Sequence, residues 1–107
     1  MPRFLTIGYG DEAGYKATDA AVIEAAHAND RKLASEGAIT GIAGKPVQVR
    51  NHGDRGVSTA AGAYLSSELP IAGFSLIEAD DLEDAIGKIA KSPCAVAQGV
   101  VEVWPLD

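Results

Sequence analysis

His27 is the side chain of this sequence best placed to move a proton. An imidazole can give or accept a proton near neutral pH, so His27 is a candidate general acid or base. It lies one position beyond Ala26 in an expected helix, at the border between the apolar stripe and the surface. The alternative is a boundary histidine that packs, forms a hydrogen bond or is simply solvated.

Two carboxylates directly follow the expected first strand. Asp11 and Glu12 lie at that strand's end, where loops commonly hold ligands. Either carboxylate could orient His27 if the helix passes over this end of the sheet, and Asp11 is the second candidate catalytic residue. The alternative is a solvated turn, which the neighbouring glycines also favour.

Three further side chains are candidates for ligand binding. Tyr9 and Tyr64 could line a cavity and donate phenolic hydrogen bonds. Glu12 is also a candidate for ligand binding. Arg50 could bind a carboxylate or a phosphate through its planar guanidinium group. The alternatives are tyrosines packed in the core with the hydroxyl at the rim, and a solvated strand residue for Arg50.

Several signals for metal or cofactor chemistry are absent. The glycines of Gly8–Gly14 have the wrong spacing for a dinucleotide-binding loop, and no His and Cys residues cluster as metal ligands. We therefore expect no metal and no cofactor. The lone Cys94 lies between Pro93 and Ala95, and we expect a small turn or core residue there rather than a catalytic thiol.

Composition limits the classes of partner. With 107 residues, we expect a single domain, residues 1–107. The net charge of −6 argues against a nucleic-acid footprint and against binding to anionic membranes. One cysteine allows no internal disulfide, and no apolar run approaches the ~20 residues of a transmembrane helix. We expect a cytoplasmic protein with a small-molecule ligand.

The chain alternates between strand and helix patterns. A helix capped by Thr18 or Asp19 is expected to end near Ser35, and a second, capped by Asp80 or Asp81, is expected to stop at Pro93. The glycine-rich Gly8–Gly14 segment is expected to be a loop. The expected strands are Phe4–Tyr9, Ala38–Ile42, Pro46–Arg50, Gly56–Thr59, Phe74–Ala79 and Val100–Val103.

This order predicts an α+β fold in which two helices cover one face of a largely antiparallel sheet. Strands such as Phe4–Tyr9 carry apolar residues on both sides, so the other face also needs a cover. A second copy of the chain is the simplest cover. We therefore expect a homodimer packed sheet to sheet.

Three segments carry a resemblance to a known family. Tyr9-Gly-Asp-Glu-Ala13, Ile71-Ala-Gly-Phe74 and Val101-Glu-Val-Trp-Pro105 resemble steps of the DGPF branch of the YCII-related proteins, in the same order along the chain. The resemblance implies a ferredoxin-like fold and a dimeric α+β barrel. It also places His27 where the family commonly has a histidine in its first helix; a helix His paired with an Asp has been proposed as that family's active site.

The chain departs from the family at the motif that gives the branch its name. Ala61-Gly62-Ala63-Tyr64 stands where Asp-Gly-Pro-Phe is expected, so a carboxylate is lost. Three classes of function follow. The first is a small-molecule enzyme using His27 as acid or base, the second a non-catalytic ligand-binding or regulatory module linked to transcription control, and the third an assembly or interaction subunit.

Overall fold

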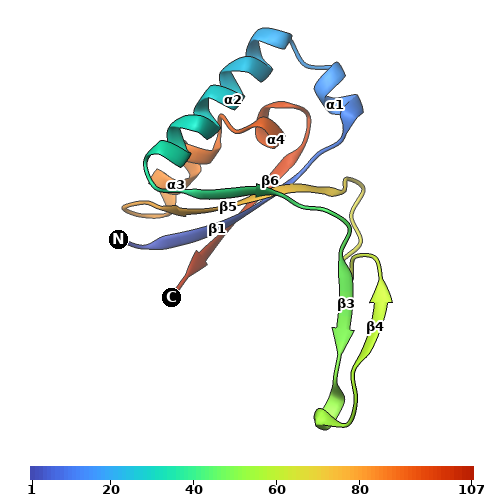
Figure 1. Cartoon of the computed structure of the whole chain (residues 1–107). Helices are drawn as coiled ribbons and strands as arrows, with labels where there is room; N and C mark the ends of the chain where they lie inside the picture. Colours follow the sequence, from blue (N-terminus) through green and yellow to red (C-terminus); the bar gives the residue numbers. More distant parts are fainter.

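A computed structural model describes the whole chain, Met1–Asp107, as a compact body with one projecting hairpin (Figure 1). The fold is α+β. The strands are β1 (Arg3–Tyr9), β2 (Ile39–Ile42), β3 (Val47–Arg50), β4 (Ser58–Ala61), β5 (Ile71–Glu78) and β6 (Val100–Leu106). The helices are α1 (Glu12–Lys16), α2 (Ala20–Ser35), α3 (Leu82–Ile89) and α4 (Pro93–Val96), with a 3₁₀ turn, η1, at His52–Asp54.

Four strands form the antiparallel sheet of the body, in the order β2-β5-β1-β6. The central strand β1 pairs with β5 on one side and with β6 on the other, so that Leu5 lies between Leu76 and Trp104. β2 pairs with the outer side of β5. The strands β3 and β4 form a separate two-stranded sheet.

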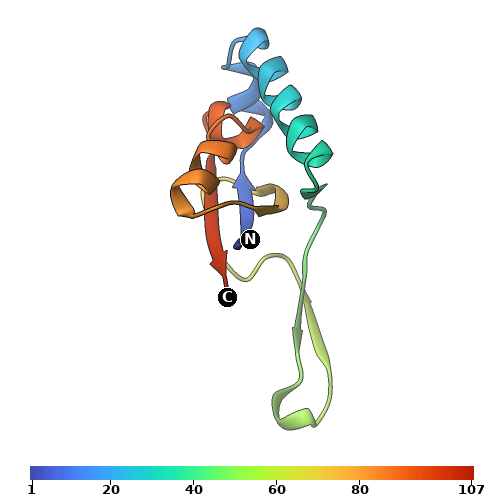
Figure 2. The same ribbon diagram turned by 90° about the vertical axis from the view of Figure 1, so that its left-hand side faces the viewer.

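The helices lie on one side of the sheet, where the core forms (Figures 1 and 2). Alternation along the strands directs one set of side chains toward the helices. Phe4 and Ile77 meet residues of α2 and α3 in a buried cluster. Its members are Phe4, Leu33, Ile77, Ala79, Ala85 and Ile89.

Side-chain caps define where the two main helices begin. Asp19 accepts a hydrogen bond from the backbone N–H of Ala21, and Asp81 accepts one from that of Asp84. Each cap satisfies a donor that the first helical turn leaves free. The sequence predicted both caps among its alternatives. α2 and α3 are then linked by a hydrogen bond from Asn29 Nδ2 to the Lys88 carbonyl oxygen, at 3.1 Å.

The structure contains two short helices, α1 and α4, that the sequence did not predict. The expected loop at Gly8–Gly14 contains the start of α1, because Asp11 caps a helical turn by accepting from the Gly14 N–H at 2.9 Å. The second long helix was expected to stop at Pro93, but α3 already ends at Ile89. Pro93 instead begins α4, and proline is tolerated there because the first N–H groups of a helix have no partner within the helix. The final strand also extends past Val103 to Leu106, and Pro105 is tolerated because β6 is an edge strand.

The opposite face of the sheet is largely apolar and uncovered. Strand register places Leu5, Leu76 and Trp104 side by side on this open face, next to the neighbouring row of Ile7 and Phe74. Phe74 and Trp104 are exposed, and Leu5, Ile7 and Leu76 are half-buried. The prediction that apolar residues occupy both faces of β1 is therefore confirmed.

The second feature of the fold is an arm, which we define as residues 44–65. It continues the β2–β5 hairpin beyond the sheet and contains β3, η1 and β4. Figures 1 and 2 show it projecting away from the helices. A hydrogen bond from the Gly62 N–H to the Pro46 carbonyl oxygen closes its base.

None of the helices is both long enough and apolar enough to cross a lipid bilayer.

Candidate functional site

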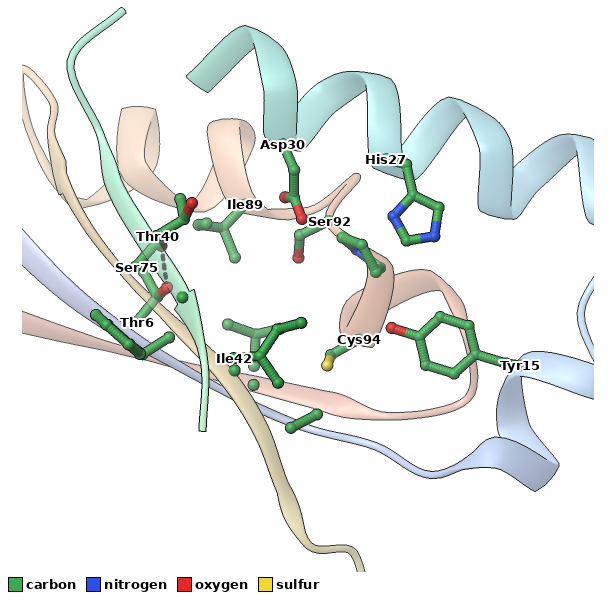
Figure 3. Close-up of a pocket in the computed structure, with 17 residues that line it drawn as sticks. Thr6, Tyr15, His27, Asp30, Thr40, Ile42, Ser75, Ile89, Ser92 and Cys94 are labelled. Atoms are coloured by element: carbon green, nitrogen blue, oxygen red, sulfur yellow. Dashed lines mark hydrogen bonds between the residues drawn. The ribbon is translucent and has the colours of Figure 1, made fainter. Parts of the chain in front are cut away.

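A cavity of about 260 Å³ lies between the helix side of the sheet and the helices (Figure 3). Strands β1, β2, β5 and β6 contribute to it, as do α1, α2, α3 and α4. It is lined by Thr6, Gly8, Tyr15, His27, Asp30, Thr40, Gly41, Ile42, Ala72, Gly73, Phe74, Ser75, Ile89, Ser92, Pro93, Cys94 and Val101. The wall therefore mixes apolar side chains with a few polar groups, as ligand sites commonly do.

His27 and Asp30 reach this cavity from α2. A spacing of three residues places two side chains on the same face of a helix. Asp30 is half-buried, and His27 is exposed at the rim. Burial raises the pKa of the Asp30 carboxyl, and the nearby positive charge of His27 partly opposes this rise. The pair therefore combines a solvent-accessible imidazole with a carboxylate that favours a cationic neighbour.

Tyr15 and Cys94 approach each other from α1 and α4. Figure 3 shows the Tyr15 hydroxyl directed toward the Cys94 sulfur. Burial raises the pKa of the Cys94 thiol; the Tyr15 hydroxyl acts in the opposite direction, and the charge of Asp30 adds to the rise. The pKa of Tyr15 is raised as well, chiefly by burial and then by the charge of Cys94. Because a thiolate is the nucleophilic form of cysteine, a protonated Cys94 is unsuited to attack at neutral pH.

Hydroxyl groups complete the cavity wall. Thr6 of β1 and Ser75 of β5 are hydrogen-bonded to each other across the two strands. Ser92, only 7% exposed, has a buried Oγ with no hydrogen-bond partner. A buried hydroxyl without a partner costs free energy, because folding removes its hydrogen bonds to water. Ser92 is thus a polar group in the cavity wall that a ligand could satisfy.

A second, more open hollow lies on the outer side of the His27 ring. It is shared by Tyr15 and His27 and adds the basic side chains Lys16 and Arg31. Lys16 is paired with Glu12 at 3.2 Å, whereas Arg31 has no carboxylate within ion-pair distance. His27 therefore stands between an inner cavity and a hollow with a free positive charge.

The two carboxylates expected to orient His27 lie elsewhere. The Asp11 side chain caps α1 through the Gly14 N–H, and Glu12 pairs with Lys16 on the exposed side of that helix. Neither lines the cavity. The physical reason is local: the chain turns helical directly after β1, and this turn uses Asp11 as its cap. Asp30 is the carboxylate beside His27.

Tyr9 and the two arm residues, Arg50 and Tyr64, do not line the cavity either. Tyr9 lies on the open face of the sheet, where its hydroxyl donates to Glu102 Oε1 at 2.6 Å; this bond is the main cause of its raised pKa. Arg50 and Tyr64 contact each other on the arm, with the guanidinium carbon 5.8 Å from the ring centre. Of the six predicted site residues, the cavity includes only His27.

The sequence carried a signal for the missed carboxylate. His27 and Asp30 have the helical i,i+3 spacing, which alone places them together once the helix is recognised. Tyr15, Ser92 and Cys94 had no such signal, because α1 and α4 reach the cavity only through tertiary packing. No three His, Cys, Asp or Glu side chains of the chain gather in a way that could hold a metal ion.

Comparison with known proteins adds no family to this description. Neither models of protein families nor curated protein sequences give a match to the chain.

Proposed function

We propose that this protein is a small-molecule enzyme in which His27 acts as general acid and base at the cavity rim. The observation that carries the proposal is the convergence of His27, Asp30, Tyr15 and the partnerless Ser92 hydroxyl on one cavity, from α1, α2 and the start of α4. A cavity with a few convergent polar groups is the usual form of a small-molecule site. Nothing in core packing alone requires this combination.

The chemistry that fits these residues is proton transfer. Asp30, one helical turn from His27 on the same face of α2, would place a negative charge near the imidazole while it takes up a proton. Ser92 would fix a polar atom of the ligand inside the cavity. Tyr15, with a raised pKa, would stay protonated and donate a hydrogen bond. Cys94 would serve as a wall, since its thiol stays protonated.

The free charge of Arg31 points to the class of substrate. A small carboxylic acid could place its anionic group in the outer hollow, near Arg31, and its reacting carbon near His27. Arginine binds carboxylates well through its paired N–H groups. At about 30 Å³ for each water-sized group, the cavity volume of about 260 Å³ limits the remainder of such a molecule to roughly nine non-hydrogen atoms.

The proposal includes the ferredoxin-like fold and the relationship to the YCII-related DGPF branch. The strand order β2-β5-β1-β6, with α2 after β1 and α3 after β5, supports this fold. The apolar open face supports the dimeric α+β barrel, in which two chains pack sheet to sheet. Burying this face would remove Trp104 and Phe74 from water, and apolar burial is the main drive for association.

The two histidines provide the test of this function. His52 lies on the arm, so His52→Ala is a matched control for His27→Ala. A panel of small carboxylic and keto acids would be screened for turnover by the wild-type protein. We expect the rate on the best substrate to fall by about 100-fold or more in His27→Ala and to stay unchanged in His52→Ala. Equal rates in wild type and His27→Ala would remove His27 from the chemistry.

A non-catalytic ligand-binding or regulatory module is the second candidate. It is favoured by the exposure of His27, which leaves the proton-transfer group in contact with water, and by the loss of the family carboxylate at Ala61-Gly62-Ala63-Tyr64. In that case, a compound of the panel would raise the melting temperature without being consumed. Ser92→Ala would then weaken binding, whereas turnover would be zero for every variant.

A further inference from the structure

The arm presents its apolar face to water. In the β3–β4 register, Val47 lies opposite Ala61 and Val49 opposite Thr59, so these side chains share one face. Val47 is 63% and Val49 66% exposed. On the other face, Arg50 is half-buried by Gln48 and Tyr64, which it contacts. The better-covered face of the arm is therefore the polar one.

A hairpin of this kind lacks the contacts to be stable alone. The strands β3 and β4 pair only with each other, and every residue of β4 is exposed. Isolated two-stranded hairpins are marginally stable in water, and further strands or a packed surface are needed. The arm thus requires a surface that its own chain does not supply.

The molecule also exposes more surface than a compact monomer of its mass. A compact monomer of 11.0 kDa exposes about 5,600 Å², whereas this chain exposes 7406 Å². The radius of gyration is 15.7 Å, against about 13 Å for a compact chain of this length. The excess surface, about 1,800 Å², is more than the roughly 800 Å² that each partner buries in a standard interface.

The direction in which the arm projects and the net charge of the arm both indicate its partner. The arm projects away from the helices, toward the side of the open sheet face (Figures 1 and 2). A second chain docked on that face would lie beside the arm. The arm has three basic residues and one acidic residue, a net charge of +2, so the rest of the −6 chain carries −8. A basic arm therefore suits the acidic body of another copy.

We propose that the arms of two copies clasp each other's bodies, with Val47 and Val49 buried against the partner. This inference rests on the sheet-to-sheet dimer of the proposed function and adds a second contact to it. The exchange is reciprocal, as two-fold symmetry requires, and it covers both uncovered surfaces of the chain at once. Each arm gains the packed surface that a lone hairpin lacks.

Hydrogen exchange of the arm amides tests the clasp in the full chain. The pure protein would be diluted through a concentration series, and the dimer fraction would be measured by sedimentation in the same samples. We expect the amides of Val47–Arg50 and Ser58–Ala61 to exchange about 100-fold more slowly in the dimer than in the monomer.

Two matched double variants test which face of the arm packs against the partner. Val47→Lys with Val49→Lys adds two charges to the apolar face, and Gln48→Lys with Ser58→Lys adds the same charges to the polar face. We expect the first pair to raise the dimer dissociation constant about 100-fold and the second to change it less than about threefold. Circular dichroism would verify that the body stays folded in both.

The outcomes separate the clasp from the proposals on which it rests. A dimer whose arm amides exchange as fast as those of the monomer would overturn the clasp and leave the sheet-to-sheet dimer standing. A protein that is monomeric at every concentration would overturn both. Equal dissociation constants for the two variant pairs would also overturn the clasp. None of these results changes the expected loss of turnover in His27→Ala, because the cavity lies within one chain.

Discussion

The body and the arm differ in what each leaves unsatisfied. The body has a buried apolar core and leaves one buried side-chain polar atom, Ser92 Oγ, without a partner. In the arm, the backbone of β3 and β4 is paired, but the apolar side chains of its valines are exposed to water. An unpaired polar group inside a cavity is suited to a ligand, whereas an uncovered apolar strand face is suited to another protein surface.

The two regions also differ in how closely their backbones pack. In the body, some glycines lie close to other backbone atoms: a Cβ on Gly99 would lie 2.2 Å from the Tyr9 carbonyl oxygen. In the arm, a Cβ on Gly44 would meet nothing within 4 Å. Stability should therefore be sensitive to change in the body, and association should be sensitive to change in the arm. The following experiments test this division.

Truncation of the core should have the largest effect. Ile77 is 2% exposed and lies in the central cluster, so Ile77→Ala should lower the free energy of unfolding by about 4 kcal/mol. Val49→Ala, on the arm, should change it by less than about 0.5 kcal/mol. Urea unfolding at concentrations where the protein is monomeric would measure both. Similar losses for the two variants would mean that the arm packs on its own body.

A glycine pair gives the next largest difference. Gly99→Ala should cost about 3 kcal/mol, since its Cβ would also lie 2.6 Å from the Cys94 carbonyl oxygen and backbone would have to move. Gly44→Ala should be nearly neutral. Thermal unfolding followed by circular dichroism would compare them. A neutral Gly99→Ala would show that the β6 entry is less tightly packed than the structure indicates.

Removing the partnerless hydroxyl should have a smaller and opposite effect. Ser92→Ala should raise the free energy of unfolding by about 1 kcal/mol, because the alanine buries no unsatisfied group. Ser58→Ala, an exposed serine of the arm, is the control and should have no effect. If Ser92→Ala were destabilising, the hydroxyl would have a partner, such as an ordered water, in the folded protein.

The smallest expected effect concerns Asp30 and the pH dependence of the free energy of unfolding. The pKa of Asp30 is higher in the folded chain than in the unfolded chain, chiefly through burial, so the folded state binds more protons between the two values. Stability should therefore fall as pH rises from about 4, the unfolded pKa, through the folded pKa. Asp30→Asn cannot lose stability in this way. The difference in free energy of unfolding between Asp30→Asn and wild type should therefore grow in favour of the variant as pH rises through that window. Denaturant titrations from pH 3 upward would detect it; a constant difference would contradict it.

Local patterns in the sequence predicted most of the fold. The two long helices, their aspartate caps and the alternation of Ser75 and Ile77 against Phe74 and Leu76 all follow from neighbouring residues. The short helices α1 and α4 were missed because glycine at Gly8–Gly14 and proline at Pro93 are equally typical of loops. Their helical turns are stabilised by a cap and by packing, which composition does not reveal.

The candidate site was less predictable than the fold. His27 was found because its residue type and its place on the helix carry information within one segment. Asp11 was named because it directly follows the first strand, and its role as the cap of α1 was not foreseen. Tyr9, Arg50 and Tyr64 were expected at a cavity, but they lie on the open face and on the arm.

The sequence by itself determined the alternation of elements, two candidates for the cap of each long helix, the presence of apolar residues on both sheet faces and the acidic charge. These are properties of neighbouring residues or of composition, and they need no long-range contact. Only the tertiary structure decided that Asp30 and Tyr15 join His27, that Ser92 is buried without a partner and that residues 44–65 leave the body. The reason is that burial and proximity between distant segments arise from packing, which no local pattern specifies.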